Sequence, residues 1–420
     1  MTPTADFPAK AVICVGDAGI NALATVRSLG RRGVPVHVVT LQGSPQIASL
    51  SRYCATQTQI RDLGALYEAL RGLKVDPARP PLLFIDNDKM IKTVAPYAAE
   101  LQRRFRVVEP LAQAVQFTDK TFQLRAAAEA GIAVPRTWLP GSWQDMAAIA
   151  GETNERLLAK PSPARFPAGK KMPSFKAVVA ASAGELERSL RSLVDSPADV
   201  LVQEYIEGGD ACHFGTVCYR ARSRNACFVL SVRKVRQTTL EAGIMAVGRV
   251  VDAPEVRDMT LRLVETLDYR GVIHVEFKRS PSDGRYYFIE WNARPPYFHS
   301  LGWKAGFDAA WLAYCDYMSP GHLDSVRVGH DSGHYWINFQ EDVRRLVKAP
   351  RLALNPATWR PYLRRKEWAV FALDDLKPWV RSMQQLGAWL TQSMSRRLRS
   401  LLLRFNPAWR PSVGRRPRIS

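Results

Sequence analysis

The chain has 420 residues, 46% of them hydrophobic, and a formal net charge of +20. The apolar content excludes a wholly disordered chain, and the length predicts two or three domains. The charge favours anionic partners: nucleotides, acidic substrates, nucleic acid or an anionic membrane surface. Half of that charge lies at the end of the chain, because residues 376–420 contain ten Lys or Arg and no Asp or Glu.

The cysteines and the apolar runs indicate the compartment. Six scattered cysteines form no CxxC pair, so neither a disulfide framework nor a zinc site is predicted. Residues 1–10 lack a signal-peptide pattern, and no apolar run approaches the ~20 residues of a transmembrane helix. We therefore expect a cytoplasmic protein, and the basic tail leaves a peripheral position at the inner membrane face open.

The N-terminal part has the pattern of an α/β domain. Apolar runs at Ala11–Val15 and Val34–Val39 flank a glycine turn and a helical pattern at Asn21–Leu29. This strand–turn–helix–strand order is typical of a parallel sheet, and Leu82–Ile85 and Arg106–Val108 are predicted as further strands. The glycine turn lacks the full GxGxxG spacing, so we interpret it as a tight turn and not as a NAD(P) site.

The character of the chain changes near Asp119. A helix is predicted over Lys120–Ala130, and a second, amphipathic one over Ala183–Leu193. Residues 161–176 form a loop rich in proline and basic residues. Further strands are expected at Leu157–Lys160, Val178–Ala181, Val200–Ile206, His213–Tyr219 and Ala226–Val232. A further helix is expected at Glu255–Leu267.

Residues 272–294 predict a β-hairpin, because two β-rich runs flank the turn sequence Pro-Ser-Asp-Gly at 281–284. A turn centred on Asp283 pairs Glu276 with Glu290 and His274 with Asn292. Alternation along the strands then separates two faces. The apolar face holds Val275, Phe277, Ile289 and Trp291, with Val275 opposite Trp291 and Phe277 opposite Ile289. The polar face holds His274, Glu276, Lys278, Glu290 and Asn292, with Arg294 next and Lys278 opposite Phe288.

The two opposed glutamates suggest a cation site. Directly opposed carboxylates repel each other, so a positive group between them is favoured. The oxygens of Glu276, Glu290 and Asn292 suit Mg²⁺, with Mn²⁺ as an alternative. A solvent-exposed polar face in which Glu276 pairs with Lys278 or Arg294 remains the other interpretation.

Glu276 followed by Glu290-Trp291-Asn292-Ala293-Arg294 resembles the E…ExNxR signature of the ATP-grasp superfamily of carboxylate–amine ligases. The resemblance extends over about residues 10–320. It implies that Glu276, Glu290 and Asn292 bind Mg²⁺ and that Arg294 contacts phosphates or the reacting carboxylate.

The same resemblance implies a nucleotide site. Lys120 starts the helix that introduces the small ATP-binding subdomain, Lys160 reaches the α- and β-phosphates, and Asp210 holds the ribose hydroxyls. Adenine is expected against the strand formed by Gln203, Glu204, Tyr205 and Ile206.

The remaining cations offer further contacts with phosphate. Lys176 is the candidate for the second phosphate-contacting lysine, with Lys170 and Lys171 as alternatives. Lys234 and Arg236 are expected to share one strand face and to meet the γ-phosphate or an acyl-phosphate, although a solvated strand face would show the same pattern. His274 is expected to be structural. Tyr297 and His299 follow the motif and are candidates for the substrate pocket.

Together these patterns predict a chain of α/β and α+β class. The expected parts are a parallel-sheet pre-ATP-grasp domain, residues 1–115; a two-lobed ATP-grasp fold, residues 116–206 and 207–320; a basic helical extension, residues 321–405; and a disordered basic tail, residues 406–420.

The predicted function is an ATP-dependent ligase. It activates a carboxylate as an acyl-phosphate and joins it to an amine, with ATP and Mg²⁺ as cofactors and small molecules as substrates. The alternatives are a non-catalytic nucleotide-binding scaffold or regulator tethered by its basic tail, and a carboxylase or phosphotransferase that uses the same ATP site. Nucleic acid is not expected as a partner. The amphipathic pattern over 383–405 leaves intramolecular packing, a protein partner and a membrane surface open. A homodimer is also left open.

Overall fold

The computed structural model describes residues 11–15, 19–44, 46–162, 175–223, 225–239, 243–330 and 333–405, with the backbone alone for 11–15 and 396–405. The expected tail, 406–420, lies outside these residues, and so do Lys170 and Lys171.

A five-stranded parallel sheet forms the N-terminal domain, as predicted, in the order β3-β2-β1-β4-β5. Gly19 caps the first helix with a φ of 68°, a conformation that costs glycine little. The strand β3 was not predicted, because its side chains are mostly exposed and polar. The strands are β1 (Ala11–Val15), β2 (Val36–Leu41), β3 (Cys54–Ile60), β4 (Leu82–Ile85) and β5 (Arg106–Val107). The helices are α1 (Ile20–Gly30), α2 (Leu66–Arg71), α3 (Asp88–Val94), α4 (Ala98–Arg104) and α5 (Ala114–Phe117).

A four-stranded antiparallel sheet forms the small lobe, in the order β6-β9-β7-β8. Its apolar residues pack with α7 and α8 in a core of their own. The elements are β6 (Thr137–Trp138), α7 (Trp143–Ala148), β7 (Leu157–Pro161), β8 (Val178–Ala180), α8 (Ala183–Arg191) and β9 (Val200–Glu204). The helix α6 (Lys120–Glu129) precedes this lobe but packs against β14 of the large lobe.

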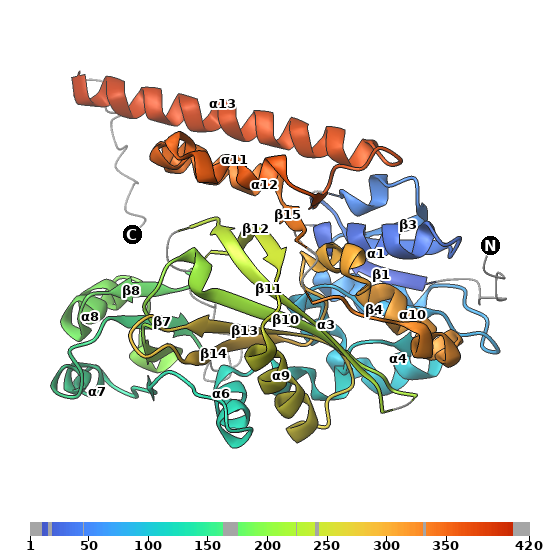
Figure 1. Cartoon of the computed structure of the whole chain (residues 1–420), viewed down its shortest axis with the longest axis horizontal. Coiled ribbons are helices and arrows are strands. Elements are labelled where there is room, and N and C mark those ends of the chain that lie inside the picture. Colours follow the sequence, from blue (N-terminus) through green and yellow to red (C-terminus); the bar gives the residue numbers. More distant parts are fainter. Residues whose placement is uncertain are drawn as a thin grey trace, which may run out of the picture.

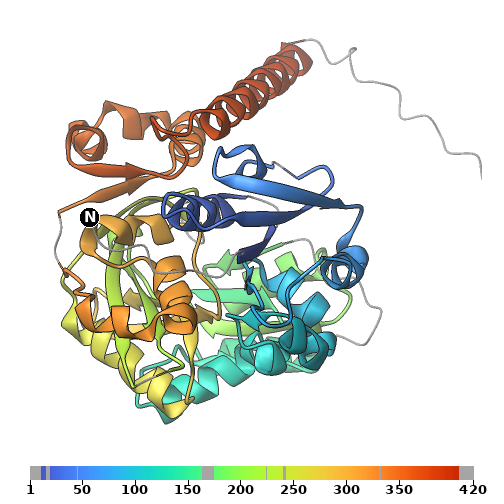
Figure 2. The same ribbon diagram turned by 90° about the vertical axis from the view of Figure 1, so that its right-hand side faces the viewer.

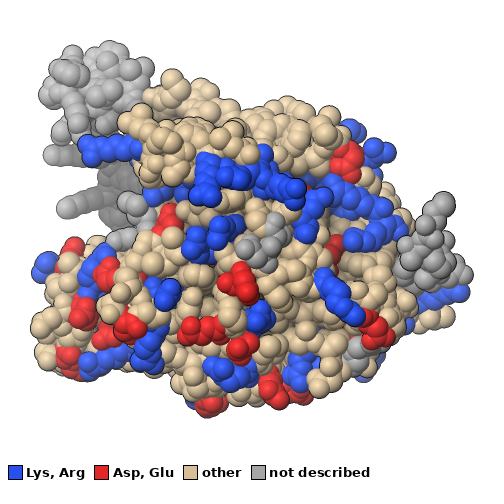
Figure 3. Space-filling view, in the orientation of Figure 1, with Lys and Arg blue, Asp and Glu red and all other residues tan. Residues whose placement is uncertain are grey.

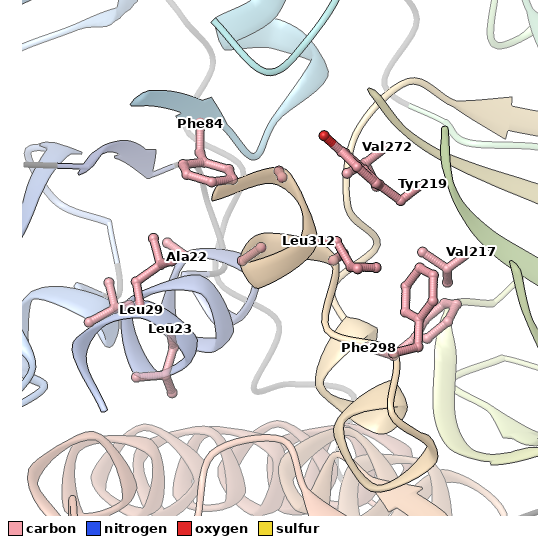
Figure 4. Packing of buried hydrophobic residues seen from close by; sticks show 14 of the residues in the cluster. Ala22, Leu23, Leu29, Phe84, Val217, Tyr219, Val272, Phe298 and Leu312 are labelled. Atoms are coloured by element: carbon pink, nitrogen blue, oxygen red, sulfur yellow. The ribbon is translucent and has the colours of Figure 1, made fainter. Parts of the chain in front are cut away.

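A seven-stranded sheet forms the large lobe, in the order β14-β13-β10-β11-β12-β15-β16. Alternation along β10 separates its two faces: Val217 and Tyr219 join a core with α1 and α10, and Cys218 joins a core with α6 and α9. Figure 4 shows side chains of the first core gathered from the N-terminal domain and the large lobe. The elements are β10 (His213–Arg220), β11 (Cys227–Gln237), β12 (Met245–Val250), α9 (Pro254–Thr266), β13 (Gly271–Arg279), β14 (Tyr286–Asn292) and α10 (Ala309–Met318).

The C-terminal extension is not purely helical, because two of its strands continue the large sheet. These strands are β15 (Tyr335–Ile337) and β16 (Lys366–Trp368). The helices of the extension are α11 (Phe339–Lys348) and α12 (Arg360–Leu363), which lie between the two strands in the sequence, and α13 (Lys377–Phe405), which follows them. In Figures 1 and 2 these helices lie together at one end of the molecule, beside the N-terminal sheet.

Buried contacts attach the extension to the rest of the chain. The guanidinium of Arg27 on α1 donates to Asp375 over 2.9 Å, and both side chains are almost fully buried. On α13, Leu386 is buried and the guanidinium of Arg344 stacks over Trp389, so the first part of this helix packs within the molecule. Among the described helices, none has the length and apolar character needed to cross a membrane.

Candidate active site

A cavity of about 380 Å³ lies where the small lobe, the large lobe and the N-terminal domain meet. Twelve of the residues predicted from the sequence line it: Lys120, Lys160, Lys176, Gln203, Glu204, Tyr205, Ile206, Lys234, Glu276, Glu290, Asn292 and Arg294. The structure therefore brings together residues that are far apart in the sequence. Two other predicted residues, Asp210 and Arg236, do not line it.

The hairpin β13–β14 has the predicted register at the site but not beyond it. His274 pairs with Asn292, Val275 with Trp291 and Glu276 with Glu290, as expected. A bulge follows, so Phe277 pairs with Phe288 and Lys278 with Tyr287, and the predicted pairs for these two residues are wrong.

The bulge also changes the two faces of the hairpin. Ile289, expected on the apolar face, lines the cavity, and Phe288 is fully buried in the core instead. A β-bulge lets one strand redirect a side chain in this way without ending the pairing. It places Ile289 and Glu290 side by side on the wall of the cavity.

Each glutamate has a lysine partner. Lys234 Nζ lies 2.8 Å from Glu276 Oε2, and Lys120 Nζ lies 3.3 Å from Glu290 Oε2. Burial alone would raise the pKa of both carboxyls, but the nearby ammonium groups reverse this effect. They hold the pKa of Glu276 well below its usual value and lower the pKa of Glu290 to about 2. Both glutamates are therefore ionised at neutral pH.

The donor set fits a hard divalent cation. Glu276 and Glu290 are opposed in register, Asn292 follows on the same wall, and all three line the cavity. In the described part of the chain, no cluster of three or more His, Cys, Asp or Glu side chains could hold a metal. A cation here would have two carboxylates and an amide from the protein, and would complete its shell with phosphate or water oxygens, as Mg²⁺ commonly does.

Three lysines make the adjoining part of the cavity cationic. Lys120, Lys160 and Lys176 approach it from α6, β7 and the segment before β8. Burial and the charge of Lys120 lower the pKa of Lys160 to about 8. A phosphate beside this lysine would raise its pKa again, because an anionic partner favours the charged form.

Residues 203–206, at the end of β9, also line the cavity, together with Leu158, which pairs with Gln203. Lys278 Nζ lies 4.1 Å from the centre of the Tyr205 ring, a cation–π contact that holds both side chains.

Asp210 lies behind the cavity wall and contacts Gln237, which lines the cavity. Its carboxylate accepts hydrogen bonds from the Gln237 side chain (3.0 Å) and backbone N–H (3.2 Å). Gln237 was not predicted from the sequence, and neither was His213, whose pKa is lowered to about 3 by burial and by Lys234. Neither residue belongs to a motif, so no sequence signal indicated them.

Arg294 connects the hairpin to the N-terminal domain. Its guanidinium donates two hydrogen bonds of 2.9 Å to Asp88, the first residue of α3. Burial would lower the pKa of Arg294, but the charge of Asp88 raises it. Asp88 also lines the cavity and was missed. A signal existed, because it closely follows the predicted strand Leu82–Ile85, and ligands of parallel sheets bind at the carboxyl ends of strands.

The histidines and Tyr297 divide between cavity and core. His274 lines the cavity with Nδ1 4.0 Å from Glu276 Oε1, and burial lowers its pKa to about 4, so it is neutral at neutral pH. Tyr297 lines the cavity, and its hydroxyl donates to the Met245 carbonyl. His299 is buried against the Asn21 carbonyl and does not line the cavity.

A second cavity of about 590 Å³ adjoins the first and shares Ile244, Arg294 and Tyr297 with it. It lies between the carboxyl ends of the N-terminal strands and the C-terminal extension. Most of its other lining residues carry amides or charges: Asn21, Asp86, Asn87, Asn338, Gln340, Glu341, Arg344 and Gln385.

The prediction that Lys234 and Arg236 share one strand face is wrong. Register shifts between β11 and β12 interrupt the alternation at these residues. Lys234 enters the cavity, whereas Arg236 forms a buried, two-pronged ion pair with Asp342 of α11 at 2.7 and 2.9 Å. The Tyr362 hydroxyl donates to the same carboxylate. In this arrangement Arg236 attaches the extension to the large sheet.

Replacing Arg236 by methionine is expected to lower the free energy of unfolding by about 3–5 kcal/mol, because it leaves Asp342 buried without its cation. Chemical denaturation measures this change. Activity per folded molecule should be retained. An Arg236→Met variant that unfolds like the wild type but is inactive would contradict this role and support the catalytic one.

Comparisons with known proteins identify the fold. No family model and no curated protein sequence matches the chain. Solved structures do match. N5-carboxyaminoimidazole synthetase from Staphylococcus aureus, complexed with ADP, has 14% identity and a TM-score of 0.53 over 74% of this chain and 78% of that one.

Two further matches are carboxylase components. Biotin carboxylase from Campylobacter jejuni, in complex with β,γ-ATP, has 15% identity and a TM-score of 0.58 over 76% of this chain and 73% of that one. The biotin carboxylase domain of Hydrogenobacter thermophilus 2-oxoglutarate carboxylase, with MgADP and bicarbonate, has 15% identity and a TM-score of 0.56 over 76% and 70%. These likenesses confirm the two-lobed fold expected from the sequence.

Proposed function

We propose that this chain, which has the ATP-grasp fold, is an ATP-dependent ligase that activates a carboxylate and joins it to an amine. One observation carries the proposal: Glu276 and Glu290 are opposed on the wall of a cavity that also presents Lys120, Lys160 and Lys176. Two carboxylates beside a cluster of cations are suited to a metal-bound polyphosphate.

We orient the nucleotide by the chemistry of the residues that line the cavity. We place the base against residues 203–206 and the phosphates toward the three lysines, with Gln237 at the ribose in place of the predicted Asp210. Glu276, Glu290 and Asn292 would hold Mg²⁺, or Mn²⁺, whose positive charge would be shared with phosphate oxygens. The similar structures were solved with ADP or MgADP bound, which supports a nucleotide site in this fold.

The reaction then proceeds in two transfers. A carboxylate oxygen of the acid attacks the γ-phosphorus, the bond to the bridging oxygen breaks, and ADP leaves with that electron pair. The amine nitrogen attacks the carbonyl carbon of the acyl-phosphate, phosphate leaves, and the nitrogen loses a proton. Arg294 and Lys234 offset negative charge on the phosphoryl group in flight, which is the main contribution of protein to such transfers.

The two cavities suggest where the substrates bind. Arg294 borders both, so an acid that contacts it lies within reach of the phosphates. The second cavity is lined by amides, by Asp86 and Glu341 and by Arg294 and Arg344, and we place the amine there, near Asp86. Residues of the C-terminal extension would then take part in the choice of acceptor.

Release of ADP tests this function. The purified protein is supplied with ATP, Mg²⁺ and a pool of amino acids, and separately with bicarbonate and amines, and products are identified by mass spectrometry. A ligase releases ADP when the acid and the amine are both present. It can also release ADP with the acid alone, if the acyl-phosphate forms before the amine binds. A non-catalytic nucleotide-binding scaffold, the alternative function, would bind ATP and release no ADP under any of these conditions.

The rate should depend on the protonation of Lys160. With its pKa at about 8 in the free protein, this lysine is charged below that pH and loses its charge as pH rises through it. We therefore expect kcat/KM for ATP to fall above about pH 8. Lys160→Arg is the matched test, since arginine keeps its charge there. An unchanged alkaline fall in that variant would assign it to another group.

A further inference from the structure

The C-terminal extension carries a surface that the proposed reaction does not use. It consists of the exposed side chains of residues 348–365, which include two short helical turns and α12. We call it the extension surface, and its exposed basic and large apolar residues are Lys348, Arg351, Leu354, Trp359, Arg360, Leu363, Arg364 and Arg365. We propose that the extension surface docks on an anionic lipid bilayer.

The charge of this segment is of one sign. Between Asp342 and Glu367 the sequence contains eight Lys or Arg and no Asp or Glu. Five of these cations belong to the extension surface and are exposed. In Figure 3, which has the orientation of Figure 1, Lys and Arg side chains gather on the upper part of the molecule, in the region of α11 and α12. Below this region, basic and acidic side chains are mixed. Clustered basic residues of this kind are attracted to the negative potential of anionic lipids.

The apolar side chains are exposed to a degree that packing within the chain does not explain. Leu354 is 83% exposed, Leu363 is 84% exposed and Trp359 is 43% exposed. Leucine, tryptophan and arginine together are the composition of segments that lie at a membrane interface, where the apolar groups insert and the cations meet headgroups.

These side chains project from a firmly anchored segment. The Tyr362 hydroxyl donates to the buried carboxylate of Asp342, and the buried Thr358 hydroxyl donates to the Leu352 carbonyl over 2.6 Å. Trp359 Nε1 donates to the Ala353 carbonyl. Because the neighbouring side chains face inward, the backbone holds Leu354 and Leu363 outward.

The positive charge and the exposed leucines of the extension surface favour a lipid bilayer over other partners. A second copy of the chain packed on the same surface would bring like charges together, and the whole chain has a charge of +20. A nucleic acid would use the cations but leave the leucines in water. An anionic bilayer accepts both. The proposal does not depend on the ligase reaction, although α11, which borders this surface, also contributes Glu341 and Arg344 to the second cavity.

Vesicle co-sedimentation of the full chain tests the proposal. Vesicles of phosphatidylglycerol with phosphatidylcholine are compared with vesicles of phosphatidylcholine alone, at low salt. We expect binding to the anionic vesicles only. The double variant Leu354→Ser/Leu363→Ser should bind them at least about tenfold more weakly, since burial of each leucine contributes to partitioning.

A matched control uses two leucines that are exposed elsewhere. Leu139 and Leu193 in the small lobe are 44% and 42% exposed, and Leu139→Ser/Leu193→Ser should bind vesicles like the wild type. Thermal unfolding of each variant verifies that it is folded. The proposal is overturned if the wild type does not bind anionic vesicles, if it binds neutral ones equally, or if Leu354→Ser/Leu363→Ser binds as tightly as the wild type.

Discussion

Replacing Glu290 by alanine should lower ADP release by about 10³-fold while the chain stays folded. Glu290 is the carboxylate opposite Glu276 on the cavity wall, and the proposed metal site loses one of its two anionic ligands without it. The fold should tolerate the change, because removing one of two opposed carboxylates relieves their repulsion, while Lys120 loses its ion-pair partner and Lys160 loses one of two nearby anionic charges.

A coupled assay for ADP and a thermal unfolding curve measure the two halves of this prediction. Glu129→Ala is the control, because Glu129 is exposed on α6 and pairs only loosely with Arg125 at 3.8 Å. The control should keep the activity and the unfolding temperature of the wild type. Unchanged ADP release in the Glu290→Ala variant would refute the assignment of the site.

Replacing Arg294 by lysine should reduce ADP release by about 10²-fold, with nucleotide affinity little changed. Arg294 borders both cavities and is held by two hydrogen bonds to Asp88, so we place its guanidinium at the acid and the transferred phosphoryl group. Lysine keeps the charge but loses the planar, two-pronged geometry. Steady-state kinetics and nucleotide titration separate the two effects.

Asp88→Asn serves as the companion variant, because it leaves Arg294 in place without its anionic partner. We expect a smaller loss, of about tenfold, since the guanidinium is then less well oriented. If Arg294→Lys loses nucleotide affinity in the same proportion as activity, the residue serves ATP binding and its proposed contact with the acid is wrong.

The hairpin shows how far local pattern predicts a site. Alternation and the turn at residues 281–284 fixed the pairing of Glu276 with Glu290, because a register is set by the turn and by the buried face. The bulge at Ile289 could not be predicted. It depends on how Phe288 and Trp291 pack with the core below β14, and those contacts come from distant segments.

Arg236 shows that the partner of a single side chain cannot be predicted from local sequence. Its partner Asp342 lies 106 positions away in the sequence, and Asp88 lies 206 positions from Arg294. A pattern along one strand predicts which residues share a face, but long-range pairing decides which of them point into a cavity. The strands β15 and β16 were missed for a related reason, since each has three residues and is recognisable only beside its neighbour.

The order of the larger elements was predictable because each rests on local composition. The helix at α6 has Asp119 as its N-cap and ends just before Gly131, as the sequence indicates. The strand β4 has the predicted bounds because four consecutive buried apolar residues suit a central parallel strand. Residues 163–174, most of the predicted phosphate loop, lie outside the described part of the chain.

The Mg²⁺ dependence of nucleotide binding can be measured by calorimetric titration with a non-hydrolysable ATP analogue, once with Mg²⁺ and once with a chelator in its place. We expect one nucleotide to bind per chain, with higher affinity when Mg²⁺ is present. The double variant Glu276→Gln/Glu290→Gln should lose this dependence on Mg²⁺. No binding, or equal affinity of the wild type with and without Mg²⁺, would contradict the proposal that these two glutamates hold a metal against the phosphates.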